Sequence, residues 1–453
     1  MLYLKRKADD YLESWYNDAS KKPLIIKGAR QVGKSETVRQ FGKQHYDNVI
    51  EINFSLRPEF KRITSTGYSV EDIIRQISII RPYLRFIPNK TLFFFDEIQD
   101  HPDIATSFKS FAQDGRFDVI GSGSMLGINY KAISSFPAGY IDNYTMRSLD
   151  FEEFLWACGY MQEQIEKFLE NIRKHDPFSE AIMYVMEKRF MDYCILGGMP
   201  EIVRSFFEKG NFSGTLKKQR DLMEAYKADV RKYAVGVDQT RILNVLDSIP
   251  NQLAKENKKF QISKVSKDAR FKDYRGCIEW LNDAGIIHIC HALHQPALPL
   301  KSNYKPDVIK IYFADTGLLI GQLDDEAQKD LRNNQNLGTY KGALYENIVG
   351  EALVKAGFEL AYYKKENATI EEDFFVRQGN NVVPIEVKSS NSQARSLKIL
   401  INSDKFPEIT WGIKFAKANI GFKENILTLP YWSSFLLDRI ITNAKGRKEQ
   451  LTI

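Results

Sequence analysis

The sequence predicts an α/β fold for the first third of the chain, built on a parallel sheet. Three observations support this prediction. Short apolar segments alternate with helical ones, which is typical of a parallel sheet covered on both faces. The apolar segment Leu92–Phe95 has the pattern of a strand buried on both faces. The glycine-containing segment GARQVGKS at 28–35 stands between a predicted strand and a predicted helix.

The elements of this first domain are predicted in order along the chain. Residues 1–20 are expected to form an amphipathic helix. Five strands are then predicted, at Leu24–Lys27, Asn48–Phe54, Thr91–Phe95, Phe117–Gly121 and Ile141–Met146. Helical segments separate the strands, so the first domain is predicted to span 1–148.

Three further regions are predicted after this domain. Residues 149–235 form a helix-rich extension, broken by the turn-forming run Gly197–Pro200. Residues 236–325 form a winged-helix-like module, in which the helix Asp273–Ala284 ends at Gly285 and the strand Ile286–Leu293 follows. The apolar face of that helix carries Tyr274, Cys277, Ile278 and Leu281.

The stretch Asp324–Gly338 is polar and is the predicted linker to the last region of the chain. Residues 335–453 are expected to form a final α/β domain. A length of 453 residues agrees with several domains, because a single core rarely extends over so long a chain.

The composition is that of an ordinary globular protein, with 43% apolar and 27% charged residues. The net charge of +6 is compatible with nucleic-acid contact but does not require it. The four cysteines are scattered, which argues against a disulfide framework. No secretion signal and no run of about 18 apolar residues is present, so a cytoplasmic protein without membrane contact is expected.

The segment at 28–35 is a candidate phosphate-binding loop that takes ATP. Its backbone N–H groups can surround a β-phosphate at the amino end of a helix. Lys34 would neutralise β- and γ-phosphate oxygens, and the Ser35 hydroxyl would bind Mg²⁺. The predicted nucleotide contacts are Gly28, Ala29, Arg30, Gln31, Val32, Gly33, Lys34, Ser35 and Glu36.

A pair of acids, Asp96 and Glu97, follows the apolar strand about 60 residues after Lys34. Ligands of open α/β sheets bind at the carboxyl ends of the strands, where these acids stand. Asp96 is predicted to hold Mg²⁺ and Glu97 to polarise the attacking water. At the end of the next strand, Ser122 could contact the γ-phosphate, with Ser124 as the alternate.

Several motifs together resemble a group of prokaryotic AAA-type ATPases whose members share a C-terminal domain of unknown function. The motifs are GARQVGKS, FFFDEIQD, VIGSGSML, SFPAGY, SLDFEEFL, ILGGMPEIV, IYFADTGLL, GALYENIVGEAL and IEVKSS. The resemblance covers nearly the whole chain and implies an AAA-type P-loop core that hydrolyses ATP. Only the first two motifs are specific for ATP.

The chain departs from this family at residues 138–140. The family usually has Ala-Gly-Arg there, whereas this chain has Ala138, Gly139 and Tyr140. If that arginine acts as a finger in related proteins, either Arg147 or Arg30 must replace it, or hydrolysis is slow. The sequence does not choose between these alternatives.

A hairpin is predicted near the C-terminus, with a turn centred on Gly379 and Asn380. Residues facing each other then have numbers that sum to 759, so Phe374 faces Ile385 and Val376 faces Val383. On the other surface Asp373 lies opposite Glu386, with Lys388 two residues further on. Directly opposed carboxylates repel unless a cation or a proton lies between them.

The arrangement of Asp373, Glu386 and Lys388 resembles the PD-(D/E)xK nuclease signature, of the restriction-endonuclease-like fold. That resemblance implies a second Mg²⁺ or Mn²⁺ held by Asp373 and Glu386, with Lys388 orienting water or neutralising the transition state. Glu346, on a predicted helix Ala343–Ala356, matches the acid that such folds contribute from their first helix. The same fold also serves as a binding or structural module without cleavage.

Two weaker signals have simpler explanations beside the functional ones. His288, Cys290, His291 and His294 cluster in sequence, but their spacing is not that of a zinc finger, so ordinary strand residues are expected. A run of lysines, comprising Lys255, Lys258, Lys259, Lys264 and Lys267, could contact a phosphate backbone or form a solvated face.

The resulting hypothesis is a Mg–ATP-dependent ATPase whose nucleotide state gates a C-terminal domain that binds nucleic acid, DNA more than RNA, and that cleaves it if the nuclease signature is active. The alternative is an ATP-dependent regulatory or signalling switch whose C-terminal domain only binds. Self-association is compatible with the sequence. An ATPase that moves protein substrates lacks support, because no pore-loop signature is present.

Overall fold

The computed structural model describes residues 2–124, 137–234, 238–255, 258–323, 325–333, 338–365, 370–388 and 392–442. Two compact units are present. The first comprises Lys5–Ser148 together with Asp283–Gly285, and the second comprises Met1–Leu4, Leu149–Asn282 and Ile286–Ile453. No helix among the described residues has the length and apolar character needed to cross a membrane.

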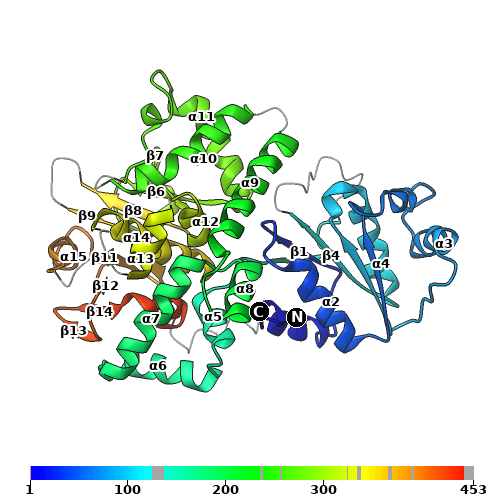
Figure 1. The fold of residues 1–453 in the computed structure, drawn as a ribbon, viewed down its shortest axis with the longest axis horizontal. Helices are drawn as coiled ribbons and strands as arrows, with labels where there is room; N and C mark the ends of the chain where they lie inside the picture. The colour runs from blue at the N-terminus through cyan, green and yellow to red at the C-terminus, as the bar shows by residue number, and fades with distance from the viewer. Residues whose placement is uncertain are drawn as a thin grey trace. The chain divides into compact units, whose positions relative to one another are not determined.

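The first unit is built on a five-stranded sheet with the order β2-β3-β4-β1-β5. Figure 1 shows this unit with β1 and β4 of the sheet labelled. Every pairing in this sheet is parallel, as predicted. Its strands are β1 (Leu24–Gly28), β2 (Asn48–Asn53), β3 (Thr91–Asp96), β4 (Asp118–Ser124) and β5 (Asp142–Thr145). Its helices are α1 (Lys7–Tyr16), α2 (Lys34–His45), α3 (Val70–Ile80) and α4 (Phe108–Asp114), and 3-10 turns lie at Pro58–Arg62, Ile98–Asp100 and Pro102–Ser107.

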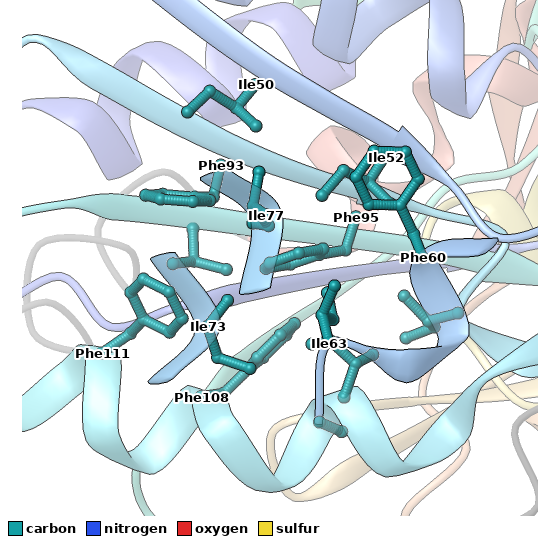
Figure 2. Close-up of a cluster of buried hydrophobic side chains, with 14 of the residues drawn as sticks. Ile50, Ile52, Phe60, Ile63, Ile73, Ile77, Phe93, Phe95, Phe108 and Phe111 are labelled. Carbon is teal, nitrogen blue, oxygen red and sulfur yellow. The ribbon is translucent and has the colours of Figure 1, made fainter. Parts of the chain in front are cut away.

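Strand β3 is buried along its whole length, because both of its faces are covered. On one face Phe93 and Phe95 point into an apolar cluster with side chains of α3 and α4 (Figure 2). The ring centroids of Phe93 and Phe111 are 5.1 Å apart, and those of Phe95 and Phe108 are 6.0 Å apart. On the other face Leu92 contacts Gly42 of α2. Each buried phenylalanine contributes roughly 1.5–3 kcal/mol, so the strand that ends in Asp96 is firmly anchored.

The second unit contains most of the helices. They are α5 (Phe151–Ala157), α6 (Gln162–Lys174), α7 (Glu180–Leu196), α8 (Pro200–Lys209), α9 (Thr215–Tyr233), α10 (Gln239–Leu253), α11 (Phe271–Asp283), α12 (Thr316–Gly321), α13 (Asp325–Asn333), α14 (Gly338–Lys355), α15 (Arg395–Ile401) and α16 (Leu437–Ile441). Helix α11 confirms the helix predicted before Gly285, whose φ of 71° lets the chain turn into a strand.

A four-stranded sheet in this unit joins residues from two of the predicted domains. Its order is β7-β6-β8-β9. The hairpin of β6 (Ile287–Leu293) and β7 (Tyr304–Phe313) is antiparallel, and β6 also pairs in parallel with β8 (Ala361–Lys364). β8 in turn pairs with the short β9 (Glu371–Glu372). The winged-helix-like segment and the C-terminal segment therefore share backbone hydrogen bonds.

The second sheet of this unit has the order β10-β11-β12-β14-β13. Its strands are β10 (Phe374–Gln378), β11 (Asn381–Val387), β12 (Gly412–Ala416), β13 (Gly421–Lys423) and β14 (Ile426–Pro430). In the β10–β11 hairpin Phe374 faces Ile385 and Val376 faces Val383, which confirms the predicted register. β11, β12 and β14 run parallel, so their carboxyl ends share one edge.

A buried glycine junction holds the start of the second unit. Leu149 N–H donates to the Gly198 carbonyl at 2.7 Å, and Gly198 N–H donates to Asp315 Oδ2 at 2.8 Å. A Cβ on Gly197 would lie under 3.0 Å from Asp315 Oδ1, and one on Gly198 would lie under 3.0 Å from the Leu149 carbonyl. Three motifs of the sequence therefore meet at one point, SLDFEEFL, ILGGMPEIV and IYFADTGLL.

Two further groups of the second unit close this junction. The Leu149 carbonyl accepts hydrogen bonds from the Tyr193 hydroxyl and the Lys355 ammonium, both at 2.8 Å. Lys355 also pairs at 2.5 Å with Glu351, a buried acid that accepts the Thr316 N–H at 2.9 Å. Burial raises the pKa of Glu351 to about 7, although Lys355 opposes the shift.

Candidate functional site

The predicted phosphate loop lies between β1 and α2. Gly28 ends the strand, and a Cβ there would lie under 3.0 Å from the Met146 carbonyl, so the close approach of the backbone requires glycine. Gly33 has φ 99° and forms the N-cap of α2. Gln31 also has a positive φ, 63°, which is uncommon for a residue with a side chain. Such sparsely populated conformations often occur at ligand sites.

Lys34 lies across this loop. Its ammonium donates to the carbonyl oxygens of Gly28 at 3.0 Å and of Ala29 at 2.9 Å. The side chain is buried, and this burial lowers the pKa of Lys34, while Glu97 and Asp96 favour the charged form. In these contacts the ammonium donates to carbonyl oxygens of the loop. It is therefore positioned to donate to phosphate oxygens instead when a nucleotide occupies the loop.

Asp96 is the centre of the hydrogen-bond network beside the loop. The Ser35 hydroxyl lies 2.9 Å from both carboxylate oxygens, and the Ser122 hydroxyl also donates to this carboxylate. Asp96 is almost fully buried, with 1% of its surface exposed. The structure thus brings together Lys34, Ser35, Asp96 and Ser122, which the sequence places on three separate strands or loops.

Two residues of this network were not predicted. Asn53 donates its amide to Asp96 Oδ2 at 2.9 Å, and the Arg39 guanidinium lies 4.0 Å from the same oxygen. Arg39 is held by Glu51, whose carboxylate lies 2.7 Å from it. Asn53 ends β2 and pairs with Asp96 in the parallel register. A polar residue at the carboxyl end of a neighbouring strand was the signal that could have found it.

Glu97 follows Asp96 in a left-handed conformation, with φ 56° and ψ 46°. Its carboxylate accepts a hydrogen bond from the Gln99 amide, and Gln99 Oε1 accepts the Ser124 N–H at 3.1 Å. Ser122, rather than Ser124, is therefore the hydroxyl that contacts Asp96. Left-handed backbone at a residue other than glycine costs of order 1–3 kcal/mol, and such strain often occurs at functional sites.

The Ser35 and Asp96 oxygens fit the metal that accompanies a nucleotide. A hydroxyl and a carboxylate are hard oxygen donors, which Mg²⁺ prefers, and both stand beside the Lys34 ammonium. Ser35 and Asp96 are the residues that would hold Mg²⁺, which would supply positive charge to neutralise the phosphates.

Neither of the two arginines considered as a replacement for the finger stands out, and Tyr140 stands where the family has arginine. Tyr140 is exposed, and the Lys109 ammonium lies 5.2 Å from the centre of its ring. Arg147 is largely buried, and this burial lowers the pKa of its guanidinium. Arg30 is exposed within the loop. The alternatives left open by the sequence stay predictions.

Arg6 supports the loop from the amino end of α1, a role that the sequence did not suggest. Its guanidinium donates to the Val32 carbonyl at 2.8 Å and to the Arg147 carbonyl at 2.7 Å. Arg6 is only 4% exposed. It therefore links the phosphate loop to the segment after β5.

The predicted acids of the second site lie in a buried cluster that also contains lysines. Glu346 accepts hydrogen bonds from Lys258, from the Lys310 ammonium at 3.1 Å and from the Tyr312 hydroxyl at 2.5 Å. Burial alone would raise the pKa of Glu346, but Lys258 and Lys310 outweigh it and hold the pKa at about 2. Glu346 is therefore neutralised by ammonium groups.

Asp373 faces the same lysine. Its Oδ1 lies 3.5 Å from the Lys310 ammonium, and its Oδ2 accepts the Val387 N–H at 2.9 Å. Glu371 lies 3.6 Å from Lys310. Burial alone would lower the pKa of Lys310, but Glu346, Asp373 and Glu371 outweigh burial and raise this pKa. Burial and the nearby Glu346 raise the pKa of Asp373.

Glu386 and Lys388 form an ion pair at the end of β11. Beside them stands Glu372, an acid that the sequence analysis did not select. Glu372 is fully buried, and neither of its carboxylate oxygens has a hydrogen-bond partner among the described residues. Burial, together with the nearby Glu386 and Asp373, raises the pKa of Glu372 well above its usual value. Such a group favours its protonated form.

The metal predicted at Glu346, Asp373 and Glu386 stays a prediction, because a lysine already neutralises part of this cluster. Lys310 pairs with Glu346 and Asp373, two of the acids predicted to hold the cation. Within the described ranges, no group of three or more His, Cys, Asp or Glu side chains could hold a metal ion. We therefore assign no chemical step at this cluster to a metal.

The lysine run also differs in part from its prediction. Lys258 turns inward to Glu346, with 15% of its side chain exposed, and so is not part of a phosphate-binding surface. Of the histidine cluster, His291 stacks on Tyr304 with ring centroids 4.7 Å apart.

Three family models match parts of the chain. The model described as AAA domain matches residues 20–155, which contain the whole network around Asp96. The chain carries an AAA-type P-loop domain. Two models described as domains of unknown function, DUF8612 and DUF4143, match residues 187–329 and 341–432. Among curated proteins no match was found.

Several solved structures are similar to the chain at low identity. A Walker-type ATPase of Pyrococcus abyssi is 15% identical over 71% of this chain and 96% of its own, with a TM-score of 0.43. The ORC1 protein of Aeropyrum pernix in complex with DNA is 11% identical over 74% and 93%, with a TM-score of 0.31. RuvB of Thermotoga maritima is 14% identical over 73% and 95%, with a TM-score of 0.30. All three are too distant to indicate what this chain binds.

Proposed function

We propose that this protein is a Mg²⁺-dependent ATPase that acts as a switch, in which the bound nucleotide controls a C-terminal domain that binds nucleic acid. The observation that carries the ATPase part is the buried Asp96 carboxylate, shared by the hydroxyls of Ser35 and Ser122 beside the Lys34 ammonium. The AAA match over residues 20–155 supports the same conclusion.

Each residue of this network has a distinct part in the reaction. The loop N–H groups and Lys34 hold the phosphates, and Ser35 with Asp96 would hold Mg²⁺. Glu97 would orient the attacking water and accept its proton. Ser122 contacts Asp96 directly, so it can report the presence of the γ-phosphate to the metal ligand. Asn53 would fix the orientation of the carboxylate.

The test is ATP binding and hydrolysis by the full chain. Glu97→Gln should bind Mg–ATP with unchanged affinity and hydrolyse it about 100-fold more slowly or worse, since general-base catalysis contributes typically 10²–10⁴-fold. Lys34→Ala should lose binding itself. Glu59→Gln is the matched control, because Glu59 is an exposed acid of the same unit outside the network. Unchanged hydrolysis in Glu97→Gln would overturn the assigned role.

The control of nucleic-acid binding is a second, separate part of the proposal. It rests on the mild basic charge and on the division of the chain into an AAA-type core (1–148), a helical extension (149–235), a winged-helix-like module (236–325) and a nuclease-like domain (335–453). DNA and RNA binding should differ between the ATP and ADP states, and Lys34→Ala should abolish that difference. Equal binding in both states would contradict it.

Cleavage of nucleic acid stays a prediction. The hairpin pairs in the predicted register, with Phe374 facing Ile385 and Val376 facing Val383, which supports a nuclease-like fold; the opposition of Asp373 and Glu386 stays a prediction. Lys310 beside Asp373 favours the alternative in which the domain only binds. Metal-dependent cleavage that disappears in Asp373→Ala would establish the nuclease, whereas binding without cleavage would establish the switch.

A further inference from the structure

A cavity of about 730 Å³ lies in the second unit, at one edge of its five-stranded sheet. Residues from α7, α13 and α14 line it, together with the residues that end or follow β12 and β14. These two strands run parallel to each other. Open α/β sheets bind ligands outside the carboxyl ends of their parallel strands. The volume lies in the range of small-molecule sites, roughly 300–1,000 Å³.

Basic side chains outnumber acidic ones in the lining. Lys188, Arg332, Lys341 and Lys417 are the bases, and Glu187 and Asp192 are the acids. Burial lowers the pKa of Lys341, and the proximity of Lys417 lowers it further. Two ammonium groups that repel each other across a cavity are stabilised by an anion between them. Lys417 is exposed at the end of β12, so it is accessible to a ligand from solvent.

Aromatic side chains form another part of the lining. The rings of Tyr345 and Tyr431 are stacked, with centroids 4.1 Å apart and planes 3° apart. Tyr184 is 72% exposed and lines the same cavity. Trp432 is buried, and its indole N–H has no acceptor among the described residues.

We propose that this cavity binds a nucleotide, with its phosphate at Lys341, Lys417 and Arg332 and its base against the tyrosines. A base supplies a planar face for stacking on the tyrosines. The phosphate supplies an anion that favours the charged form of both lysines. Neither the family models nor the phosphate loop accounts for this site.

The cavity also touches the nuclease-like motif. The Tyr431 hydroxyl donates to the Lys388 carbonyl, directly after β11. A ligand that packs on the Tyr431 ring is therefore connected, through this one side chain, to the segment that carries Glu386 and Lys388. The nucleotide can be free in solution or can be the end of a nucleic-acid strand, since both present the same base and phosphate.

The test uses the full chain carrying Lys34→Ala, so that the phosphate loop does not contribute binding. Titration calorimetry would measure four probes: adenosine 5′-monophosphate, adenosine, inorganic phosphate and a 5′-phosphorylated five-residue oligothymidylate. The further variants are Lys417→Ala for the phosphate, Tyr184→Ala for the base, and Lys423→Ala as the control. Lys423 is an exposed lysine of the same sheet that does not line the cavity.

The monophosphate should bind, and Lys417→Ala should weaken it about tenfold, as expected for one charge-assisted hydrogen bond. Tyr184→Ala should weaken the monophosphate but not inorganic phosphate. Binding of the oligonucleotide alone, with the same dependence on Lys417, would support the proposal and identify a strand end as the source. Binding of no probe, an effect of Lys423→Ala equal to that of Lys417→Ala, or equal affinity for phosphate and monophosphate would overturn it.

Discussion

Replacement of Lys310 by methionine tests whether a lysine neutralises the buried acids of the second unit. Methionine keeps the length of the side chain and removes its charge. The Lys310 ammonium lies 3.1 Å from Glu346 and 3.5 Å from Asp373, and only 2% of its side chain is exposed. Loss of one partner of a buried ion pair costs about 3–5 kcal/mol. Lys258 still pairs with Glu346, so we expect about 3 kcal/mol, the low end of that range.

Calorimetry would measure this loss of stability as a lower midpoint temperature for the thermal unfolding of the second unit. A change of about 3 kcal/mol corresponds to a decrease of roughly 6–12 °C for a domain of 150–250 residues, and less for a larger unit. Lys301→Met is the control, because Lys301 is an exposed lysine whose pair with Glu359 should contribute under about 1 kcal/mol. The double variant Lys310→Met/Glu346→Gln should lose less than the sum of the single changes.

The effect should also depend on pH in a definite direction. The pKa of Glu346 is held at about 2, below its unfolded value, so its pairing stabilises the fold above an unfolded pKa of about 4.5. That stabilisation is lost as the pH falls from about 4.5 toward 2. The difference between the parent protein and Lys310→Met should therefore be full at pH 7, decrease as the pH falls below about 4.5, and become small only near pH 2. A midpoint that responds to Mn²⁺ and to chelators, but not to Lys310→Met, would refute the reasoning.

Three further predictions concern the loop and the junction. Gly28→Ala would place a Cβ under 3.0 Å from the Met146 carbonyl, so ATP affinity in an equilibrium titration should fall at least about tenfold while the midpoint of the second unit stays unchanged. Arg6→Ala removes two hydrogen bonds from the backbone that carries the loop, and ATP affinity should fall by a similar factor, with partial recovery in Arg6→Lys. The pKa of Glu351 is raised to about 7, so its contribution to stability is full below about pH 4.5 and is lost as the pH rises through 7. The unfolding midpoint of the parent protein should therefore fall between pH 5 and 8, and it should fall less in Glu351→Gln.

The sequence predicted those parts of the site that local pattern determines. The phosphate loop and the strand before Asp96 are continuous segments, so glycine spacing and a run of apolar residues were sufficient to find them. Ser122 was found because it directly follows the predicted strand Phe117–Gly121, and the strand there pairs with the strand of Asp96. The hairpin register followed from the turn at Gly379, since pairing alternates residue by residue.

The remaining features depend on contacts between distant segments. Nothing near Lys310 shows that its side chain turns inward to Glu346 and Asp373, which lie 36 and 63 residues further along the chain. The same is true of Arg6, whose contact with Arg147 spans 141 residues. A lysine on a strand is usually solvated, so its pairing with buried acids is decided by the packing of α14 on the sheet. For the same reason the sequence could not show that a lysine pairs with two of the acids predicted to hold a metal.

The glycine junction at Leu149, Gly197 and Gly198 affects how loss-of-function data on this chain should be interpreted. These glycines contact no candidate catalytic group, yet any side chain there would collide with backbone or with Asp315. A saturation mutagenesis screen would therefore find them as intolerant of change as Gly28 and Gly33. Intolerance to substitution would then be the same at two sites with different roles. Nucleotide is expected to bind at the phosphate loop, whereas the glycine junction holds the second unit together. Separate measurements of abundance and of ATP affinity would distinguish them, because the junction variants should lower the amount of folded protein while the loop variants should lower nucleotide binding.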